Sequence, residues 1–139
     1  MSLFRIFDIA GSGMSAQSLR LNATASNIAN AESVSSSIDK TYRARHPIFA
    51  TVMNEFQFDE EGATGGVQIQ GIVESQAPLH QEYQPDHPMA DEQGYVYFPN
   101  VSIVEEMANM IAASRSYQSN VEVMNASKQM LIHTLNLGQ

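Results

Sequence analysis

One stretch of the chain, LHQEYQPDHPMAD, holds several side chains of the types that bind zinc. His80, Glu82 and His87 supply imidazole and carboxylate groups, and Asp86 and Asp91 lie beside them. The spacing of these residues fits neither a helix face nor a strand face, and prolines interrupt it, so nothing in the sequence brings the ligands together. We therefore interpret them as solvated loop residues and expect no metal site.

Other groups that could take part in catalysis are isolated from one another. The segment GSGMS, at 11–15, superficially resembles a phosphate-binding loop, but it has no lysine and no preceding strand. His46 precedes Pro47 with no nucleophile nearby, and His133 lies beside an apolar stripe. The acidic run Asp59–Glu61 has no partner at catalytic spacing. The sequence therefore predicts neither an enzyme nor a bound cofactor.

Charge is unevenly distributed along the chain of 139 residues. The net charge is −8; residues 51–100 hold nine acidic and no basic residues, whereas residues 36–50 carry a net charge of +2. We do not expect so acidic a chain to bind nucleic acid. Cysteine is absent, and no apolar run approaches the roughly 20 residues of a membrane span. Arg5 and Asp8 interrupt the apolar residues at the N-terminus, so we expect no cleaved secretory signal.

Apolar residues recur every seven positions at both ends of the chain. At the N-terminal end one series holds Phe7, Met14, Leu21 and Ile28, and an interleaved series holds Leu3, Ala10, Gln17, Thr24 and Ala31. At the C-terminal end one series holds Ile103, Met110, Tyr117, Met124 and Leu131, and the other holds Met107, Ser114, Val121, Lys128 and Leu135. Such a pattern is typical of coiled-coil helices and predicts a long helix at each end.

The N-terminal series is too weak to hold a stable helix by itself. Gln17 and Thr24 occupy core positions, and Gly11 and Gly13 lower the helix propensity of the first half. The segment TASNIANAES, at 24–33, holds mostly small and amide side chains, which let backbones approach closely. We therefore expect this helix to gain its stability in a crowded helical assembly. An antiparallel pair within one monomeric domain is the alternative, and the pattern does not specify whether the two helices pair within or between chains.

The middle of the chain reads as a small β unit with long loops. Apolar and polar residues alternate at Glu55–Phe58, Val67–Glu74 and Tyr95–Asn100, which predicts three strands. The proline-containing stretch between the last two strands is predicted as loop. Asn100 or Ser102 is a suitable N-cap for the C-terminal helix.

The predicted fold class is therefore α+β, mainly α. Long N- and C-terminal helices form a coiled-coil-like pair, with a small β-hairpin or β-rich insert and long loops between them. We divide the chain into an N-terminal helix within residues 1–35, a loop and small β insert at residues 36–100, and a C-terminal helix within residues 101–139.

Several segments resemble the rod and hook proteins of the bacterial flagellum, and proximal-rod subunits in particular. They are AGSGMSAQSLRLNATASNIANAES, YRARHPIF, GIVESQAPLHQEYQPDHPMADEQGYVYFPNV and EEMANMIAASRSYQSNVEVMNASKQMLIHTLNLGQ, which together cover most of the chain. SNIAN is similar to a signature of the whole family, whereas DEQGYVYFPNV and SRSYQSNVEV are more specific. Residues 52–66 match least.

The resemblance implies a structural subunit of the flagellar rod, the tubular drive shaft that transmits motor torque and is required for flagellum assembly and motility. Its implied partners are further copies of itself, the other proximal and distal rod subunits, the protein at the junction of the rod base and the MS ring, and the type III export apparatus during secretion. It implies no nucleic acid and no membrane insertion. The implied location is the basal body, where the rod spans the periplasm.

The resemblance also implies which residues contact neighbouring subunits. Together with the two seams, these are Phe7, Met14, Leu21, Ala25, Ser26, Asn27, Ile28, Ala29, Asn30, Ile103, Met107, Met110, Ser114, Arg115, Tyr117, Gln118, Val121, Met124, Leu131 and Leu135. The alternative function is a non-enzymatic, oligomeric coiled-coil adaptor whose acidic β insert binds a partner.

Overall fold

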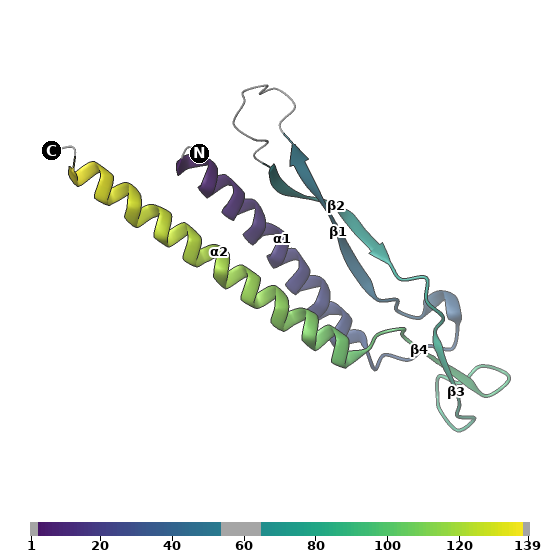
Figure 1. Cartoon of the computed structure of the whole chain (residues 1–139). Coiled ribbons are helices and arrows are strands. Elements are labelled where there is room, and N and C mark those ends of the chain that lie inside the picture. Colours follow the sequence, from purple (N-terminus) through teal and green to yellow (C-terminus); the bar gives the residue numbers. More distant parts are fainter. Residues whose placement is uncertain (1–2, 54–64, 138–139) are drawn as a thin grey trace.

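The computed structural model describes residues 3–53 and 65–137 of the chain. In chain order its elements are α1 (Leu3–Asn30), the 3-10 helix η1 (Ile38–Lys40), β1 (Arg45–Met53), β2 (Gly65–Glu74), β3 (His80–Tyr83), β4 (Tyr95–Phe98) and α2 (Ile103–Leu137) (Figure 1). Two long helices thus enclose small antiparallel β units in the sequence, which confirms the predicted α+β fold class.

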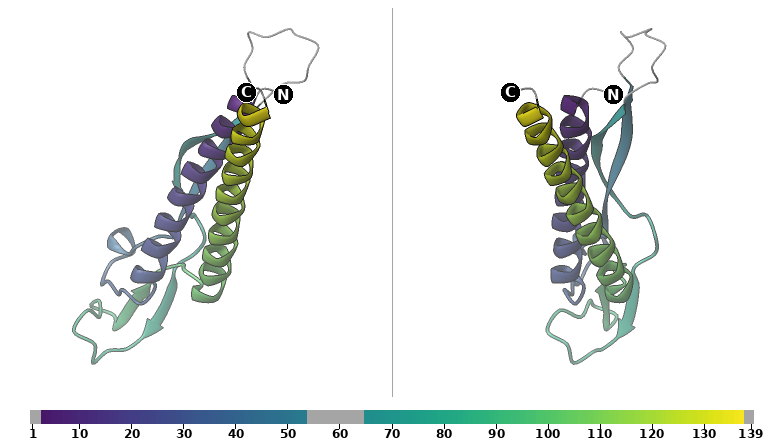
Figure 2. Two further views of the ribbon diagram at one scale, coloured as in Figure 1. Left: turned by 90° about the vertical axis from the view of Figure 1, so that its left-hand side faces the viewer. Right: turned by 60° about the vertical axis from the view of Figure 1, so that its left-hand side comes forward.

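The two helices lie side by side and antiparallel within one chain, so that both termini lie at the same end of the molecule (Figure 1). The hairpin of β1 and β2 packs along α1 and lies away from α2 (Figure 2). Helix α1 is therefore the central element, with α2 on one side and the hairpin on the other. The heptad pattern left open whether the helices pair within or between chains; in the single chain they pair with each other.

Small and polar side chains form the seam between α1 and α2. On α2 the buried residues are Glu106, Ala113 and Ser127. The Arg20 Nη2 of α1 donates a hydrogen bond of 2.9 Å to the Asn109 Oδ1 of α2. A side chain at Gly13 would lie only 2.9 Å from the Asn120 Nδ2, so glycine permits this close approach.

The buried line on α2 differs from the expected seam by one residue. The expected series ran through Met107, Ser114 and Lys128, whereas the buried residues precede each of these positions. The reason is that the seam uses small residues, which allow the two backbones to approach, and the larger apolar side chains are displaced to the flank of α2. The heptad pattern therefore located the helix correctly but not the face that α2 turns toward α1.

Helix α2 begins where an N-cap was expected. The Ser102 Oγ accepts a hydrogen bond of 3.5 Å from the Glu105 amide, while acidic side chains occupy the first turn, where the helix dipole favours them. The other candidate, Asn100, uses its side chain elsewhere. Its Oδ1 accepts a hydrogen bond of 2.8 Å from the Ala44 amide, and its Nδ2 donates one of 2.9 Å to the Ala77 carbonyl. Asn100 thus ties the start of α2 to the loops on both sides of the hairpin.

The first β unit is the antiparallel hairpin of β1 and β2, paired from Arg45 with Glu74 to Met53 with Gly65. The register shifts between Ile48 and Phe49. The strand expected near Val67 is confirmed in β2. Strand β1 was not predicted, because Pro47 obscured its otherwise apolar run; the hairpin has only two strands, and proline is tolerated on such an edge. The strand expected at 55–58 lies outside the described residues.

The second β unit pairs β3 with β4, from His80 with Phe98 to Tyr83 with Tyr95. The strand expected near Tyr95 is confirmed. Strand β3 lies in the stretch predicted as loop, because its sequence HQEY is mostly polar and gives little β signal. On its other side, Tyr97 of β4 exchanges two backbone hydrogen bonds with Ser35, of 3.0 and 3.1 Å. The loop that follows α1 therefore supports β4.

Candidate subunit interface

A buried amide joins α1 to the base of the hairpin. The Asn27 side chain is fully enclosed, with 0% of its surface exposed. Its Nδ2 donates to the Arg45 carbonyl, and its Oδ1 accepts from the Arg45 amide, both at 2.9 Å. The Tyr42 hydroxyl donates a third hydrogen bond to the same oxygen, also of 2.9 Å. Asn27 thus pairs with both backbone groups of Arg45, as a neighbouring strand would.

The segment Ala25–Asn30, which was expected to contact neighbouring subunits, has some residues on the surface and others enclosed within the chain. Ala25 and Ala29 are exposed on the surface of α1, and Ile28 is half-buried. The Ser26 Oγ lies 3.2 Å from the Tyr42 hydroxyl, and the Asn30 Nδ2 donates to the Ser26 carbonyl. Only the two alanines therefore offer a largely open surface, while Asn27 holds the hairpin from inside the chain.

A similar link near the other end of α1 was not foreseen. The Ser12 Oγ donates to the Ile9 carbonyl at 2.8 Å and accepts from the Val67 amide of β2 at 3.1 Å. Ser12 belongs to the segment that superficially resembled a phosphate loop. That segment is part of α1, and its hydroxyl fixes the hairpin rather than a ligand.

Large apolar side chains on α2 remain exposed in the single chain. Val104 is 78% exposed, and Met107 and Ile111 are each 53% exposed. Further along the helix, the exposed large apolar residues are Tyr117, Val123, Met130, Ile132, Leu135 and Leu137. So many exposed apolar residues on one helix are typical of a surface that a partner covers.

The remaining expected interface residues lie on the flanks of the helix pair. Ile103, Arg115 and Gln118 are exposed. The half-buried ones are Phe7, Met14, Leu21, Met110, Ser114, Val121, Met124 and Leu131. The two expected seams therefore lie on the same helix pair, but much of the apolar surface of their residues is not buried between the two helices.

The residues considered as metal ligands are not brought together. Among residues 3–53 and 65–137, no group of three histidine or acidic side chains is placed to hold a metal ion. His80, Glu82 and Asp86 are exposed, and the His87 Nδ1 accepts from the Met89 amide at 3.1 Å. His46 and His133 are also exposed, and 59–61 lie outside the described part of the chain.

Within the same described ranges, neither helix is long and apolar enough to cross a membrane.

Asp91 organises the loop between β3 and β4. Its Oδ1 accepts from the amides of Tyr95 and Gln93, at 2.8 and 2.9 Å, and its Oδ2 accepts from the Tyr97 hydroxyl at 3.3 Å. The hydrogen bond from the Tyr95 amide is the main cause that lowers the pKa of Asp91 below its ordinary value of 3.8. Burial, assisted by the charge of Asp91, raises the pKa of Tyr97. Gly94 closes the turn with a φ of 83°, which favours glycine.

The order of this loop should depend on acid in a defined direction. Because the pKa of Asp91 is lowered in the folded chain, its contribution to stability is complete above about pH 4 and is lost as the pH falls through the lowered value. Amide chemical shifts of Gln93 and Tyr95 should therefore stay constant from pH 7 to about pH 4 and change below it. The Asp91→Asn variant should lack this transition. A transition midpoint above the ordinary pKa of an aspartate would contradict the assignment.

The two ends of the chain match models of known protein families. Residues 7–34 match the family described as flagella basal body rod protein, and residues 92–137 match the C-terminal family of the flagellar basal body rod FlgEFG proteins. The chain is 50% identical to the flagellar basal-body rod protein FlgC of Salmonella typhimurium over 139 residues, which cover all of both chains. The chain belongs to the FlgC family of flagellar basal-body rod proteins.

Other relatives in the FlgC family agree over the whole length. The FlgC protein of Yersinia enterocolitica is 50% identical, and that of Buchnera aphidicola from Acyrthosiphon pisum is 41% identical, each over 139 residues and all of both chains. The two family models coincide with α1 and with β4 plus α2, so the helix pair is the part shared with other rod proteins. This chain is accordingly a structural protein of the flagellar basal-body rod.

Proposed function

We propose that this chain is a proximal-rod subunit that polymerises through its helix pair into the tubular shaft that transmits motor torque. The observation that supports this most strongly is the exposed apolar flank of α2, in particular Val104, Met107 and Ile111. Covering such side chains stabilises an assembly by about 25 cal/mol for each Å² of apolar surface removed from water. In a rod, neighbouring subunits would provide that cover.

The seam inside the chain supports the same proposal. It buries small and polar residues, including Ala113, Ser127 and Glu106, and the Gln17 Oε1 is buried without a hydrogen-bond partner in the described part of the chain. A seam of this kind gains little from apolar burial, and an unsatisfied buried oxygen costs about 1–3 kcal/mol. We infer that the helix pair is only marginally stable alone and becomes rigid beside other subunits.

In the proposed assembly, the contacts with neighbours are made by the surface residues of Ala25–Asn30 and Ser114–Gln118, together with the apolar residues of both expected seams. Asn27 would contribute indirectly, by fixing the hairpin to α1. Contacts through different surfaces of one subunit can build an open helical array, which is the geometry that a shaft requires.

The proposed partners are other copies of the chain, the other proximal and distal rod proteins, and the protein at the junction of the rod base and the MS ring. The chain would reach the rod unfolded, through the type III export apparatus, and without a cleaved signal peptide. A marginally stable helix pair suits that route, because little free energy is needed to unfold it. Its role in the rod, which spans the periplasm, would be mechanical, with no catalytic step.

Complementation tests this function directly. In a flagellated bacterium whose own copy of this rod protein is deleted, expression of the chain should restore hook–basal bodies and swimming. Variants Ile28→Asp and Met124→Asp should be synthesised but should not restore swimming, because each places a charge on an apolar contact face. The proposal fails if the chain never enters basal bodies and instead forms a closed, protease-resistant oligomer, which would favour an adaptor.

A further inference from the structure

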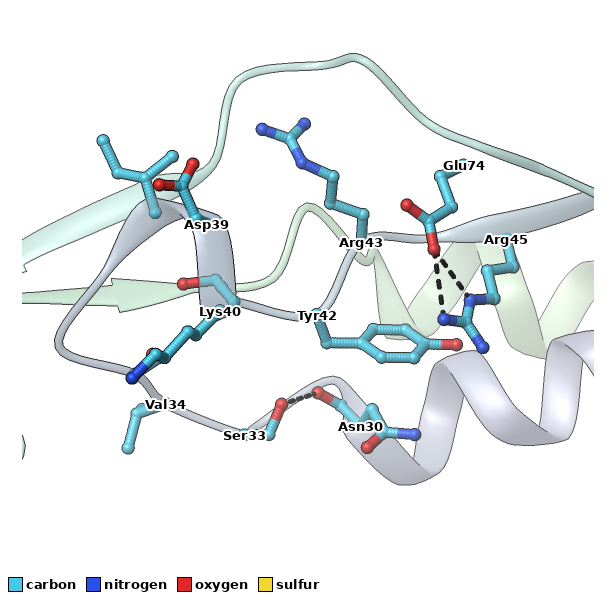
Figure 3. A pocket seen from close by; sticks show the side chains of 12 residues that line it. Asn30, Ser33, Val34, Asp39, Lys40, Tyr42, Arg43, Arg45 and Glu74 are labelled. Atoms are coloured by element: carbon cyan, nitrogen blue, oxygen red, sulfur yellow. Dashed lines mark hydrogen bonds and ion pairs between the residues drawn. The ribbon is translucent and has the colours of Figure 1, made fainter.

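A polar cavity of about 570 Å³ lies where the end of α1, the loop around η1 and the start of the hairpin meet (Figure 3). Most of its lining comes from the loop between α1 and β1, and Arg45 and Glu74 close one side. No residue of β3, β4, the loop between them or α2 lines it. The cavity is thus separate from the exposed apolar flank of α2.

The cavity is lined by three basic side chains, Lys40, Arg43 and Arg45, and by two acidic ones. Arg45 is paired with the carboxylate of Glu74 at 3.1 Å and lies over the Tyr42 ring, so its charge is already used inside the chain. The Arg43 Nη1 donates hydrogen bonds to two backbone carbonyls, those of Ser75 and Ala77. Among the residues that the structure describes, no carboxylate pairs with the positive charge of Arg43.

Lys40 is the second cation available in the cavity. Its side chain is exposed, and its ammonium forms no hydrogen bond or ion pair within the described part of the chain. Asp39 is the remaining acidic group of the lining, beside Lys40. With Glu74 occupied by Arg45, the cavity retains two cations against one carboxylate.

The complementary charge lies on the β3–β4 unit, at the same end of the molecule as the cavity (Figure 1). Glu82, Asp86 and Glu92 are exposed on the β3–β4 unit, and none of them forms an ion pair in the part of the chain that the structure describes. This unit projects beyond the ends of the helix pair (Figure 1). The hydrogen bonds that Asp91 accepts from Gln93 and Tyr95 close the turn that carries Glu92, and the His87 amide donates to the Gln84 carbonyl across the turn that carries Asp86. These two turns form the acidic tip of the unit.

We propose that, in the assembled rod, the basic cavity of one copy receives the acidic β3–β4 tip of a neighbouring copy. The inference rests on the proposed function, because it needs copies held side by side. Residues 51–100 hold nine acidic and no basic residues, so neighbouring copies would repel one another there unless a basic surface of the next copy lay between them. Cavity and tip are different surfaces of one chain, so the contact can repeat from copy to copy along an open helical array.

A charge exchange tests the contact. The cavity variant Lys40→Glu/Arg43→Glu and the tip variant Asp86→Lys/Glu92→Lys should each lower the yield of hook–basal bodies about tenfold or more, because like charges then face each other. The two pairs combined in one chain should restore most of the yield. A control, Gln68→Lys/Gln70→Lys, adds two charges at exposed positions of β2 outside both surfaces and should have little effect.

The combined chain also separates this inference from the proposed function. If unaltered chain restores rods but the combined chain is no better than either pair alone, or if the separate pairs have no effect, the inference is wrong while the rod function stands. If unaltered chain restores no rods, the proposed function itself fails. Thermal unfolding of the purified tip variant, followed by circular dichroism, should match that of the unaltered chain, because Asp86 and Glu92 are exposed. The cavity variant should unfold at a lower temperature, because Arg43 is half-buried and donates to two carbonyls, and that loss of stability should persist in the combined chain even though the yield of hook–basal bodies is restored.

Cross-linking identifies the occupant of the cavity. Because the chain has no cysteine, Lys40→Cys and Asp86→Cys can be placed on two differently tagged copies that are expressed together. Mild oxidation of isolated basal bodies should yield a disulfide-linked dimer that carries both tags. Absence of the mixed dimer from assembled basal bodies would overturn the proposal, as would cross-linking of the cavity cysteine to a different protein alone.

Discussion

Replacing Asn27 by alanine is expected to lower the free energy of unfolding by about 2–4 kcal/mol. The side chain makes three hydrogen bonds, two with the backbone of Arg45 and one with the Tyr42 hydroxyl, and it has no exposed surface. Its removal leaves a buried amide, a carbonyl and a hydroxyl without their partner. Urea unfolding of the purified variant measures the loss, and faster hydrogen exchange of the Arg45 amide would locate it.

Two variants show whether the effect belongs to the buried amide. Asn22→Ala changes the same residue type at an exposed position of α1 and should change stability by no more than about 0.5 kcal/mol. Tyr42→Phe removes one of the three bonds and should cost about 1 kcal/mol. Equal stabilities of the Asn27→Ala and Asn22→Ala variants would mean that the junction does not hold the hairpin to α1.

Exchange of two exposed apolar residues on α2, Met107→Asp/Ile111→Asp, is expected to abolish rod assembly and swimming while the isolated chain stays folded. Both side chains are 53% exposed in the single chain, so the substitution should cost about 1 kcal/mol or less, mostly in helix propensity. In the rod the same positions would become buried, where an unpaired carboxylate costs several kcal/mol. Swimming assays and counts of purified basal bodies give the readout.

The matched control places the same two charges elsewhere on α2. Ala112 and Ser119 are also exposed, and they lie two helical turns apart, about a third of a turn around α2 from Met107 and Ile111. Ala112→Asp/Ser119→Asp should therefore have the same modest cost in stability but a much smaller effect on swimming. If both double variants swim normally, the apolar flank is not a contact surface. If both fail equally, the loss of swimming comes from the added charges and gives no support to a contact at that flank.

The heptad pattern was sufficient to predict both helices, but neither their pairing within one chain nor the register of the seam. Periodicity marks where apolar side chains lie, regardless of which molecule covers them. In α2 the series through Met107 is largely exposed, while Ala113 and Ser127 form the internal contact. A sequence that must pack against several neighbours places its larger apolar residues outside its own seam, so the strongest pattern need not be the internal one.

The Asn27 junction could not be predicted from local sequence. SNIAN indicates a helix with amide side chains, but the partners of Asn27 are 15 and 18 residues away, at Tyr42 and Arg45. Strand β3 was missed for a related reason: its polar residues pair only because β4 lies beside them. The acidic tip was recognised as charged loop, whereas its order depends on the three hydrogen bonds that Asp91 accepts.

Accessibility of a single cysteine at Met107 tests most directly whether neighbouring subunits cover the flank of α2. Since the chain has no other cysteine, a Met107→Cys variant carries one label site, and complementation first establishes that it still forms rods. The purified variant should react with a maleimide nearly as fast as it does in urea. In isolated basal bodies the same cysteine should react about tenfold more slowly or not at all, because neighbours protect it. Equal reactivity in purified chain and in basal bodies would contradict the proposed packing of the rod.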